Sequence, residues 1–138
     1  ENRQTAVFKD FAHSPSKVEA TTNAVKEQYA NRKLLACLEL HTYSSLNEDF
    51  LKEYVGTLDK ADEAVVFYSP HAVKIKRLKE VSQEQIARAF KRDDLVIYTD
   101  PKEFKEFLFS QNLADTTLLL MSSGNYGGLD FEEVKELL

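Results

Sequence analysis

Five short apolar runs, each separated from the next by a polar loop and a segment with helical spacing, constrain the fold of this chain more than any other feature. The runs lie within residues 5–10, 34–40, 64–68, 95–98 and 117–121. They lack the alternation of half-exposed strands, which is typical of strands buried on both faces of a parallel sheet. We therefore predict an α/β protein: a three-layer, Rossmann-like sandwich with a mostly parallel sheet of five to six strands and helices on both faces.

The segments between the runs carry helix start and stop signals. Pro15 suits a first helical turn, which Ser14 or Ser16 could cap, and this helix is predicted to extend to about Tyr29. Residues 82–85, Ser-Gln-Glu-Gln, form a capping-box pattern. A further helix is predicted from about Phe50 to Gly56, and Asp100 and Asp130 are predicted to cap two more helices that start there. Residues 71–80 alternate apolar side chains with lysines and make a poor helix, so an extended conformation is the alternative there.

Length, charge and hydropathy limit the functional classes. With 138 residues the chain is long enough for one domain with its own core, and its formal net charge of −5 leaves no basic excess for binding nucleic acid. No apolar run approaches the roughly 18 residues of a transmembrane helix, so neither a nucleic-acid nor a membrane partner is expected. Cys37, the only cysteine, is predicted to be a buried thiol in a reducing compartment. The chain starts at Glu1 without a methionine, and we expect a fragment of a longer protein.

The segments after the predicted strands hold the residues best suited to bind a ligand. All parallel strands direct their carboxyl ends to one edge of the sheet, where ligands bind in α/β folds. The three histidines and three of the four glycines of the chain fall in these segments. We therefore predict a binding surface at this edge, formed by the strand ends at residues 10–13, 39–43, 68–71, 99–100 and 122–128.

Several of these residues also have a purely structural interpretation. Asp10 could accept hydrogen bonds from loop N–H groups, or it could offer its carboxylate to a ribose, an ammonium group or a metal-bound water. His13 could be an exposed residue at a helix start or a phosphate contact. The histidines are too widely spaced for a zinc motif, so no metal site is predicted within this domain. The loop 122–128 could be a simple connection, or its glycines could let the backbone approach a ligand closely.

Two kinds of nucleotide or signalling module lack their motifs here. Neither a G-x-G-x-x-G loop after the first strand nor a G-x-x-x-x-G-K-[ST] loop occurs, so a phosphate cradle for ATP would have to lie outside this chain. A phosphoacceptor receiver domain needs an aspartate after the third strand and a lysine after the fifth, where this chain has Ser69 and Ser122. A non-catalytic nucleotide-binding α/β module remains an alternative.

Residues 10–15 carry a family resemblance. Their sequence, Asp-Phe-Ala-His-Ser-Pro, is similar to the D-[YF]-x-H-x-P signature that opens the C-terminal domain of Mur ligases, with Ser14 where the family often has a second histidine. Residues 39–46 lie where that family has its second loop, and residues 121–128 resemble the last-strand loop of its murein peptide ligase branch. Thr42 and Ser45 stand where alanine-adding relatives carry arginines. The resemblance therefore favours a peptide-adding member, with an alanine-adding domain as the alternative.

The resemblance implies a cytoplasmic bacterial ligase with three domains, of which residues 1–138 form the third. Its substrates would be ATP, UDP-N-acetylmuramate and the tripeptide L-Ala-γ-D-Glu-meso-diaminopimelate, joined through an acyl phosphate in peptidoglycan recycling. ATP and Mg²⁺ would be bound mainly by the central domain, and the isolated chain, without a catalytic residue of its own, would be inactive. By the same resemblance, Asp10, His13 and Ser14 would face ATP. Five residues would lie near the amine or the transferring phosphate: Glu39, His41, Thr42, Tyr43 and Ser45. Six residues would bind the peptide: Ser122, Ser123, Gly124, Asn125, Tyr126 and Gly127.

Overall fold

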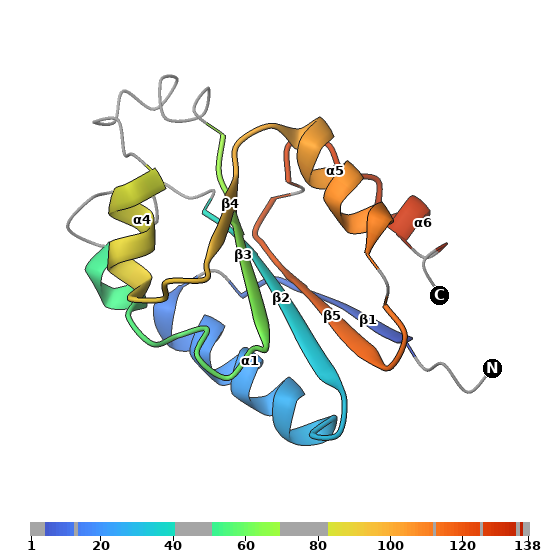
Figure 1. The fold of residues 1–138 in the computed structure, drawn as a ribbon, viewed down its shortest axis with the longest axis horizontal. Helices are drawn as coiled ribbons and strands as arrows, with labels where there is room; N and C mark the ends of the chain where they lie inside the picture. Colours follow the sequence, from blue (N-terminus) through green and yellow to red (C-terminus); the bar gives the residue numbers. More distant parts are fainter. Residues whose placement is uncertain are drawn as a thin grey trace.

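The computed structural model describes residues 5–12, 14–40, 51–69, 83–111, 113–124, 126–134 and 136. In chain order they form the strand β1 (Thr5–Asp10), the helix α1 (Pro15–Gln28), β2 (Lys33–Glu39), the 3-10 helix η2 (Lys52–Tyr54), β3 (Glu63–Phe67), α4 (Gln83–Phe90), β4 (Val96–Tyr98), α5 (Pro101–Ser110), β5 (Thr116–Met121) and α6 (Phe131–Val134). The five strands of this described part form one parallel sheet in the order β1-β5-β2-β3-β4 (Figure 1). The predicted parallel α/β architecture is confirmed.

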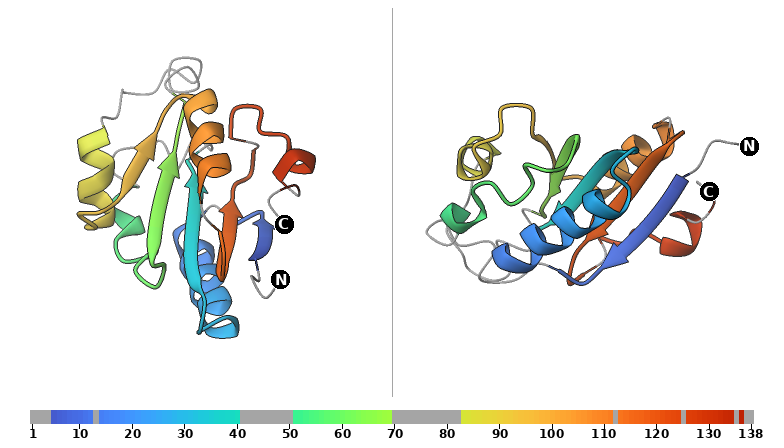
Figure 2. Two further views of the ribbon diagram at one scale, coloured as in Figure 1. Left: turned by 45° about the vertical axis from the view of Figure 1, so that its right-hand side comes forward. Right: turned by 90° about the horizontal axis from the view of Figure 1, so that it is seen from below.

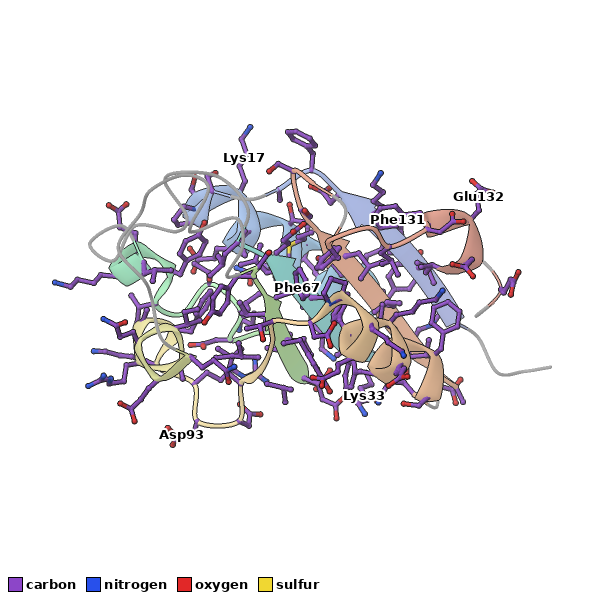
Figure 3. The ribbon with its side chains drawn as sticks, turned by 90° about the horizontal axis from the view of Figure 1, so that it is seen from above. Lys17, Lys33, Phe67, Asp93, Phe131 and Glu132 are labelled. Atoms are coloured by element: carbon purple, nitrogen blue, oxygen red, sulfur yellow. The ribbon has the colours of Figure 1, made fainter. Side chains whose placement is uncertain are left out.

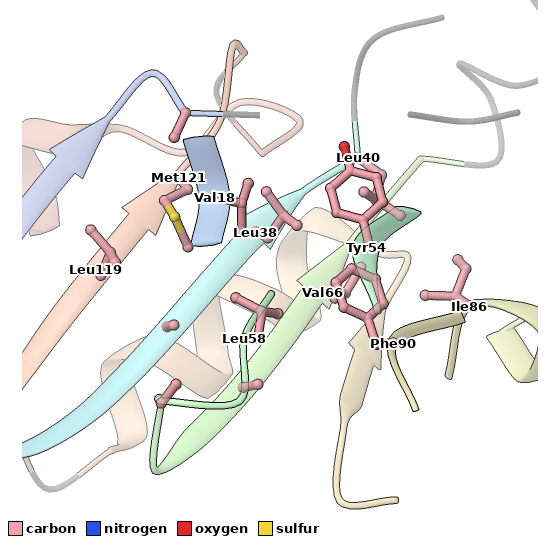
Figure 4. Packing of buried hydrophobic residues seen from close by; sticks show 14 of the residues in the cluster. Val18, Leu38, Leu40, Tyr54, Leu58, Val66, Ile86, Phe90, Leu119 and Met121 are labelled. Carbon is pink, nitrogen blue, oxygen red and sulfur yellow. The ribbon is translucent and has the colours of Figure 1, made fainter. Parts of the chain in front are cut away.

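Helices cover both faces of the sheet and so complete three layers. Along β2, successive side chains point to opposite faces, with Leu34 and Leu38 on one and Leu35 and Cys37 on the other. The first face packs against α1, η2 and α4 (Figure 4), and the second packs against α5 and α6. Figure 2 shows α1 and α5 on opposite sides of the strands. Every residue of β2 after Lys33 is buried, so this strand lies at the centre of the core.

Cys37 lies within β2, and its side chain is fully buried. Burial raises the pKa of this thiol well above its ordinary value, so the reactive thiolate does not form near neutral pH. The prediction of a buried, unreactive thiol is confirmed.

The helix starts follow the sequence signals in most cases. Asp100 caps α5 by accepting a hydrogen bond from the Lys102 N–H at 3.0 Å, and Asp130 accepts one from the Glu132 N–H at 2.9 Å. Ser14 is the N-cap residue of α1, which was one of the two alternatives, but its hydroxyl makes no capping hydrogen bond. In the segments that the structure describes, no helix is both long and apolar enough to cross a membrane.

The helix predicted from Phe50 to Gly56 is only partly within the described residues. Its described part contains the 3-10 turn η2, and Phe50 lies outside. Tyr54 of η2 is buried and stacks on Phe90 of α4, with ring centroids 5.2 Å apart. η2 ends at Tyr54, two residues before Gly56, whose φ of +76° suits glycine. Residues 71–80, for which the sequence left two alternatives, also lie outside the described residues.

The register of the sheet brings three strand ends to the same level. Asp10 of β1 and Leu38 of β2 both pair with Met121, the last residue of β5, because β5 inserts between the first two strands. The Ser122 N–H then donates to the Asp10 C=O at 3.0 Å. The loops that follow β1 and β5 therefore meet at one edge, beside Glu39 at the end of β2.

The opposite edge of the sheet is held by ion pairs and by hydrogen bonds to the backbone. Asp62 accepts hydrogen bonds from the Lys26 ammonium at 2.8 Å and from the Leu34 N–H at 2.7 Å. Burial acts to raise the pKa of Asp62 and is the largest single influence. The two hydrogen bonds and the charges of Lys26 and Lys33 together outweigh it and lower that pKa. Arg92 donates to the Asp62 C=O at 3.1 Å. These polar groups join strands to loops, so their role is structural.

Candidate functional site

A buried carboxylate lies at the carboxyl edge of the sheet. Glu39 is the last residue of β2, and its exposed fraction is only 3%. Its Oε1 accepts hydrogen bonds from the Ser122 hydroxyl at 2.5 Å and from the Tyr126 N–H at 2.8 Å. Both donors belong to the loop 122–128, which follows β5. A carboxylate from the second strand thus organises the loop after the last strand.

A further hydrogen bond closes the loop 122–128 on itself. The Ser122 hydroxyl, which donates to Glu39, also accepts a hydrogen bond from the Gly124 N–H at 2.7 Å. The N–H of Gly124, the hydroxyl of Ser122, Oε1 of Glu39 and the N–H of Tyr126 form one continuous network of hydrogen bonds. Bonds in such a network polarise and strengthen one another. The tip of the loop, at residues 123 and 124, is therefore held in a fixed bend.

Tyr126 anchors this loop in the core. Its ring is 1% exposed, stacks on Phe104 of α5 with centroids 4.8 Å apart and lies 5.9 Å from the ring of Phe67. Figure 3 shows Phe67 in the interior, between the strands and α5. The Tyr126 hydroxyl lies 2.7 Å from the Met121 C=O and 2.9 Å from the Cys37 C=O, and it can donate a hydrogen bond to either oxygen. The sequence predicted this ring in a peptide pocket. In the structure the ring lies in the core, where its hydroxyl is within hydrogen-bond distance of carbonyl groups of β2 and β5.

The backbone of residues 126–128 has positive φ angles throughout. At Tyr126 the value is +55°, which is uncommon for a residue with a side chain and is maintained here by the buried ring and the bond to Glu39. Gly127 has a φ of +73°, and a Cβ on it would lie 2.6 Å from Cγ of Pro101. Gly127 was predicted to let the backbone approach a ligand; in the structure it lets the loop approach the first residue of α5.

The tip of the loop is polar. Ser123 Oγ is shielded from solvent and has no hydrogen-bond partner within the described residues. Folded proteins leave few buried hydroxyls unpaired, so a ligand or another segment of the protein could satisfy this one. Asn125, the next residue predicted to contact a ligand, lies outside the described residues.

A cavity of about 210 Å³ lies between the loop after β1 and the first turns of α1. Asp10 lines it and accepts a hydrogen bond from the Ala12 N–H at 2.8 Å, which is the structural role foreseen as one alternative. Phe11, exposed by 69%, and Lys17, which points outward from α1 in Figure 3, also line this cavity. Phe11, Lys17 and Thr21, which also line the cavity, were not predicted as site residues from the sequence. The spacing of residues 17, 20 and 21 on one helical face was the signal available.

Comparison with known proteins agrees with the signature at residues 10–15. A sequence model of the family described as "Mur ligase, glutamate ligase domain" matches residues 1–124. The chain belongs to the Mur ligase C-terminal domain family. Glu39 and the start of the loop 122–128 lie within the matched residues.

Curated relatives of this Mur ligase domain are named for one activity. The UDP-N-acetylmuramate–L-alanine ligase of Ruthia magnifica subsp. Calyptogena magnifica is 25% identical over 127 residues, which are 90% of this chain and 27% of that protein. The ligase of the same name from Lactobacillus delbrueckii subsp. bulgaricus is 30% identical over 100 residues, which are 72% of this chain and 22% of that protein. The chain spans about a quarter of the length of the curated relatives it matches.

Solved structures share the fold of the Mur ligase domain. A domain described as that of a UDP-N-acetylmuramate:L-alanyl-γ-D-glutamyl-meso-diaminopimelate ligase from Haemophilus ducreyi 35000HP matches with a TM-score of 0.68 at 22% identity. That match covers 99% of this chain and 94% of the other. The murein peptide ligase of Psychrobacter arcticus 273-4 matches with a TM-score of 0.73 at 19% identity, covering 98% of this chain and 28% of that one. At these identities the likeness shows the fold alone.

Some of the residues predicted for the Mur ligase site are joined in the structure, and others lie outside the described residues. Hydrogen bonds join Glu39, Ser122, Gly124 and Tyr126, and the backbone of Asp10 joins them through Ser122. Outside the described residues lie His13, His41, Thr42, Tyr43, Ser45 and Asn125. Within the described ranges, no three histidine, cysteine, aspartate or glutamate side chains form a group that could hold a metal ion.

Proposed function

We propose that this chain is the third, C-terminal domain, residues 1–138, of an ATP-dependent ligase that joins an acceptor amine to the carboxyl group of UDP-N-acetylmuramate. The observation that carries the proposal is the level alignment of the β1, β5 and β2 ends. It sets the cavity beside Asp10 and the loop 122–128 on one edge of a Mur ligase domain. The names of the curated relatives supply the sugar nucleotide.

The proposed reaction has two steps. The muramate carboxylate takes the γ-phosphoryl group of ATP, which leaves ADP and gives an acyl phosphate. The acceptor amine then attacks the acyl carbon, the bond to the phosphate oxygen breaks, and the nitrogen loses a proton as inorganic phosphate leaves. Phosphoryl transfer depends mainly on positioning and on stabilisation of charge, and Mg²⁺ supplies the latter. The task of this domain is to hold the acceptor and one part of ATP in place.

The cavity beside Asp10 is suited to one part of a nucleotide. Its volume of about 210 Å³ is smaller than the roughly 300–1,000 Å³ of a complete small-molecule pocket. ATP would therefore be shared with a central domain that also holds Mg²⁺. We propose that Asp10, His13 and Ser14 face ATP, and that Lys17 adds a positive charge at the same cavity.

The loop 122–128 is the proposed acceptor side. Its tip consists of Gly124 and of Ser123, whose shielded hydroxyl has no partner among the described residues, and hydrogen bonds fix its conformation. The segment after β2 is the other proposed contact. We propose that four side chains lie near the amine or the transferring phosphate: His41, Thr42, Tyr43 and Ser45. We propose that the acceptor is bound by the side chains of Ser122, Ser123 and Asn125 and by the backbone of Gly124 and Gly127.

We propose the tripeptide L-Ala-γ-D-Glu-meso-diaminopimelate as the acceptor, which would place the reaction in peptidoglycan recycling. Residues 121–128 resemble the last-strand loop of the murein peptide ligase branch, and this resemblance supports the tripeptide. Two solved structures with the same fold are described as ligases of this peptide or of murein peptide. L-Alanine is the second candidate, because the curated sequence relatives are named for it.

A comparison of the two acceptors tests the proposed function. The full-length protein is supplied with ATP, Mg²⁺, UDP-N-acetylmuramate and either the tripeptide or L-alanine, and phosphate release and product mass are measured. We expect an amide product when UDP-N-acetylmuramate and an acceptor are both present, and we expect it to form at least about tenfold faster from the tripeptide than from L-alanine. The isolated chain is expected to release no phosphate. Omitting UDP-N-acetylmuramate is the control.

Faster reaction with L-alanine would replace the tripeptide by the second candidate and keep the rest of the proposal. Absence of any amide product with either acceptor would contradict the proposed function itself.

A further inference from the structure

One oxygen atom accepts hydrogen bonds from two residues of the loop 122–128. Oε1 of Glu39 accepts from the Ser122 hydroxyl, at the start of the loop, and from the Tyr126 N–H, four residues later. We propose that Glu39 is a positioning residue for the acceptor: it sets the conformation of this loop and does not itself contact the reacting atoms. The inference rests on the proposed function and deepens it by separating the residue that shapes the site from those that touch the substrate.

The burial of Glu39 argues against direct contact with a substrate. Its exposed fraction is 3%, and its Oε1 is occupied by two donors from the loop 122–128. A group that took part in proton transfer would have to come within hydrogen-bond reach of the reacting atom. The acceptor would have to displace the Ser122 hydroxyl or the Tyr126 N–H to reach this oxygen, and that would dismantle the loop.

The geometry also indicates which property of Glu39 matters. Both hydrogen bonds need an acceptor oxygen at one point in space, and neither donor is charged. The amide oxygen of a glutamine lies equally far from the backbone and can accept both bonds. An alanine leaves the Ser122 hydroxyl and the Tyr126 N–H without this partner, and a buried donor without a partner is costly. Positioning therefore predicts that glutamine is tolerated and alanine is not.

The group that Glu39 positions is the tip of the loop. Ser123 lies between Ser122, which donates to Glu39, and Gly124, which donates to Ser122. Its own hydroxyl is shielded from solvent and unpaired within the described part of the protein. Releasing the loop from Glu39 would move this hydroxyl and the neighbouring N–H groups. We expect the binding of the acceptor to weaken, whereas ATP, at the cavity beside Asp10, would be affected little.

The test uses the full-length protein with three variants, Glu39→Gln, Glu39→Ala and the control Glu63→Gln. Glu63, at the start of β3, forms a half-exposed ion pair with Lys33 at 3.2 Å on the opposite edge of the sheet. The KM for the acceptor, the KM for ATP, kcat and the Tm are measured, with the kinetics run below the melting transition. We expect Glu39→Ala to raise the KM for the acceptor at least about tenfold with less than about a threefold change in the KM for ATP. Glu39→Gln and Glu63→Gln are expected to stay within about threefold of the parent in every kinetic constant.

Two outcomes would overturn the inference. A fall in kcat of about a hundredfold or more in Glu39→Gln, with an unchanged KM, would show that the charge of Glu39 takes part in the reaction. A lower Tm in Glu39→Ala with an unchanged KM for the acceptor would show that its role is only structural. If Glu39→Ala does not fold, Glu39→Asp keeps the charge but withdraws the oxygen from both donors, and it must raise the same KM selectively. An inactive parent protein would instead count against the proposed function.

Discussion

Replacing Tyr126 by alanine is expected to lower the free energy of unfolding by about 3–5 kcal/mol, the usual effect of removing a large aromatic ring from a core. The ring is 1% exposed and stacks on Phe104 at 4.8 Å. Tyr126→Phe keeps the ring but loses the donor to the Met121 and Cys37 C=O groups, and it should cost about 1–2 kcal/mol. Urea unfolding of this 138-residue chain, followed by circular dichroism, measures both changes.

Phe11→Ala is the matched control, because Phe11 is also aromatic but is 69% exposed, and its loss should change stability by no more than about 0.5 kcal/mol. A loss below about 1 kcal/mol in Tyr126→Ala would contradict the core assignment. Together with a raised KM for the acceptor, it would restore the sequence-based view that this ring binds the peptide.

Gly127→Ala is expected to lower the free energy of unfolding by about 2–4 kcal/mol through two separate effects. The φ of +73° costs an alanine about 1–2 kcal/mol. The new Cβ would lie 2.6 Å from Cγ of Pro101 and 3.4 Å from Cζ of Phe67, and relieving such overpacking typically costs about 1–3 kcal/mol. The same urea titration measures the change.

Gly56→Ala separates the two effects. Gly56 has nearly the same φ, +76°, but the nearest atom to its added Cβ is Asp59 Oδ2 at 3.6 Å, which is an ordinary contact. The difference between the two variants therefore reports the collision with α5 alone. Equal losses at both positions would mean that the loop 122–128 moves away from Pro101 without cost, and that it is not rigidly held.

Much of the fold could be predicted because its signals are local. The strands 5–10, 34–40 and 117–121 were visible as apolar runs and differ from the observed strands by one residue at most at each end. Asp100 and Asp130 were identified as caps, and both make the expected hydrogen bonds, because a capping carboxylate acts on N–H groups only two residues away.

The parts that could not be predicted depend on contacts between distant segments. The apolar runs do not indicate that β5 inserts between β1 and β2, because the order of strands depends on how strands and helices pack together in the whole domain. Glu39 was predicted to lie near the amine or the transferring phosphate, and the sequence did not indicate its burial because the donors that it binds, at residues 122 and 126, are distant in the chain. Tyr126 was predicted to bind the peptide, and its burial follows from its packing on Phe104 and from hydrogen bonds to carbonyl groups on two strands.

The proposal that the loop 122–128 binds the acceptor is tested most directly by locating the acceptor on this domain. Hydrogen–deuterium exchange of the full-length protein is followed with UDP-N-acetylmuramate and a non-hydrolysable ATP analogue, with and without the tripeptide. We expect the tripeptide to slow exchange in the peptides that cover residues 122–128, while the helix α4, residues 83–90, exchanges as before. Unchanged exchange at residues 122–128 in an enzyme that turns over the tripeptide would contradict the assignment of this edge as the acceptor site.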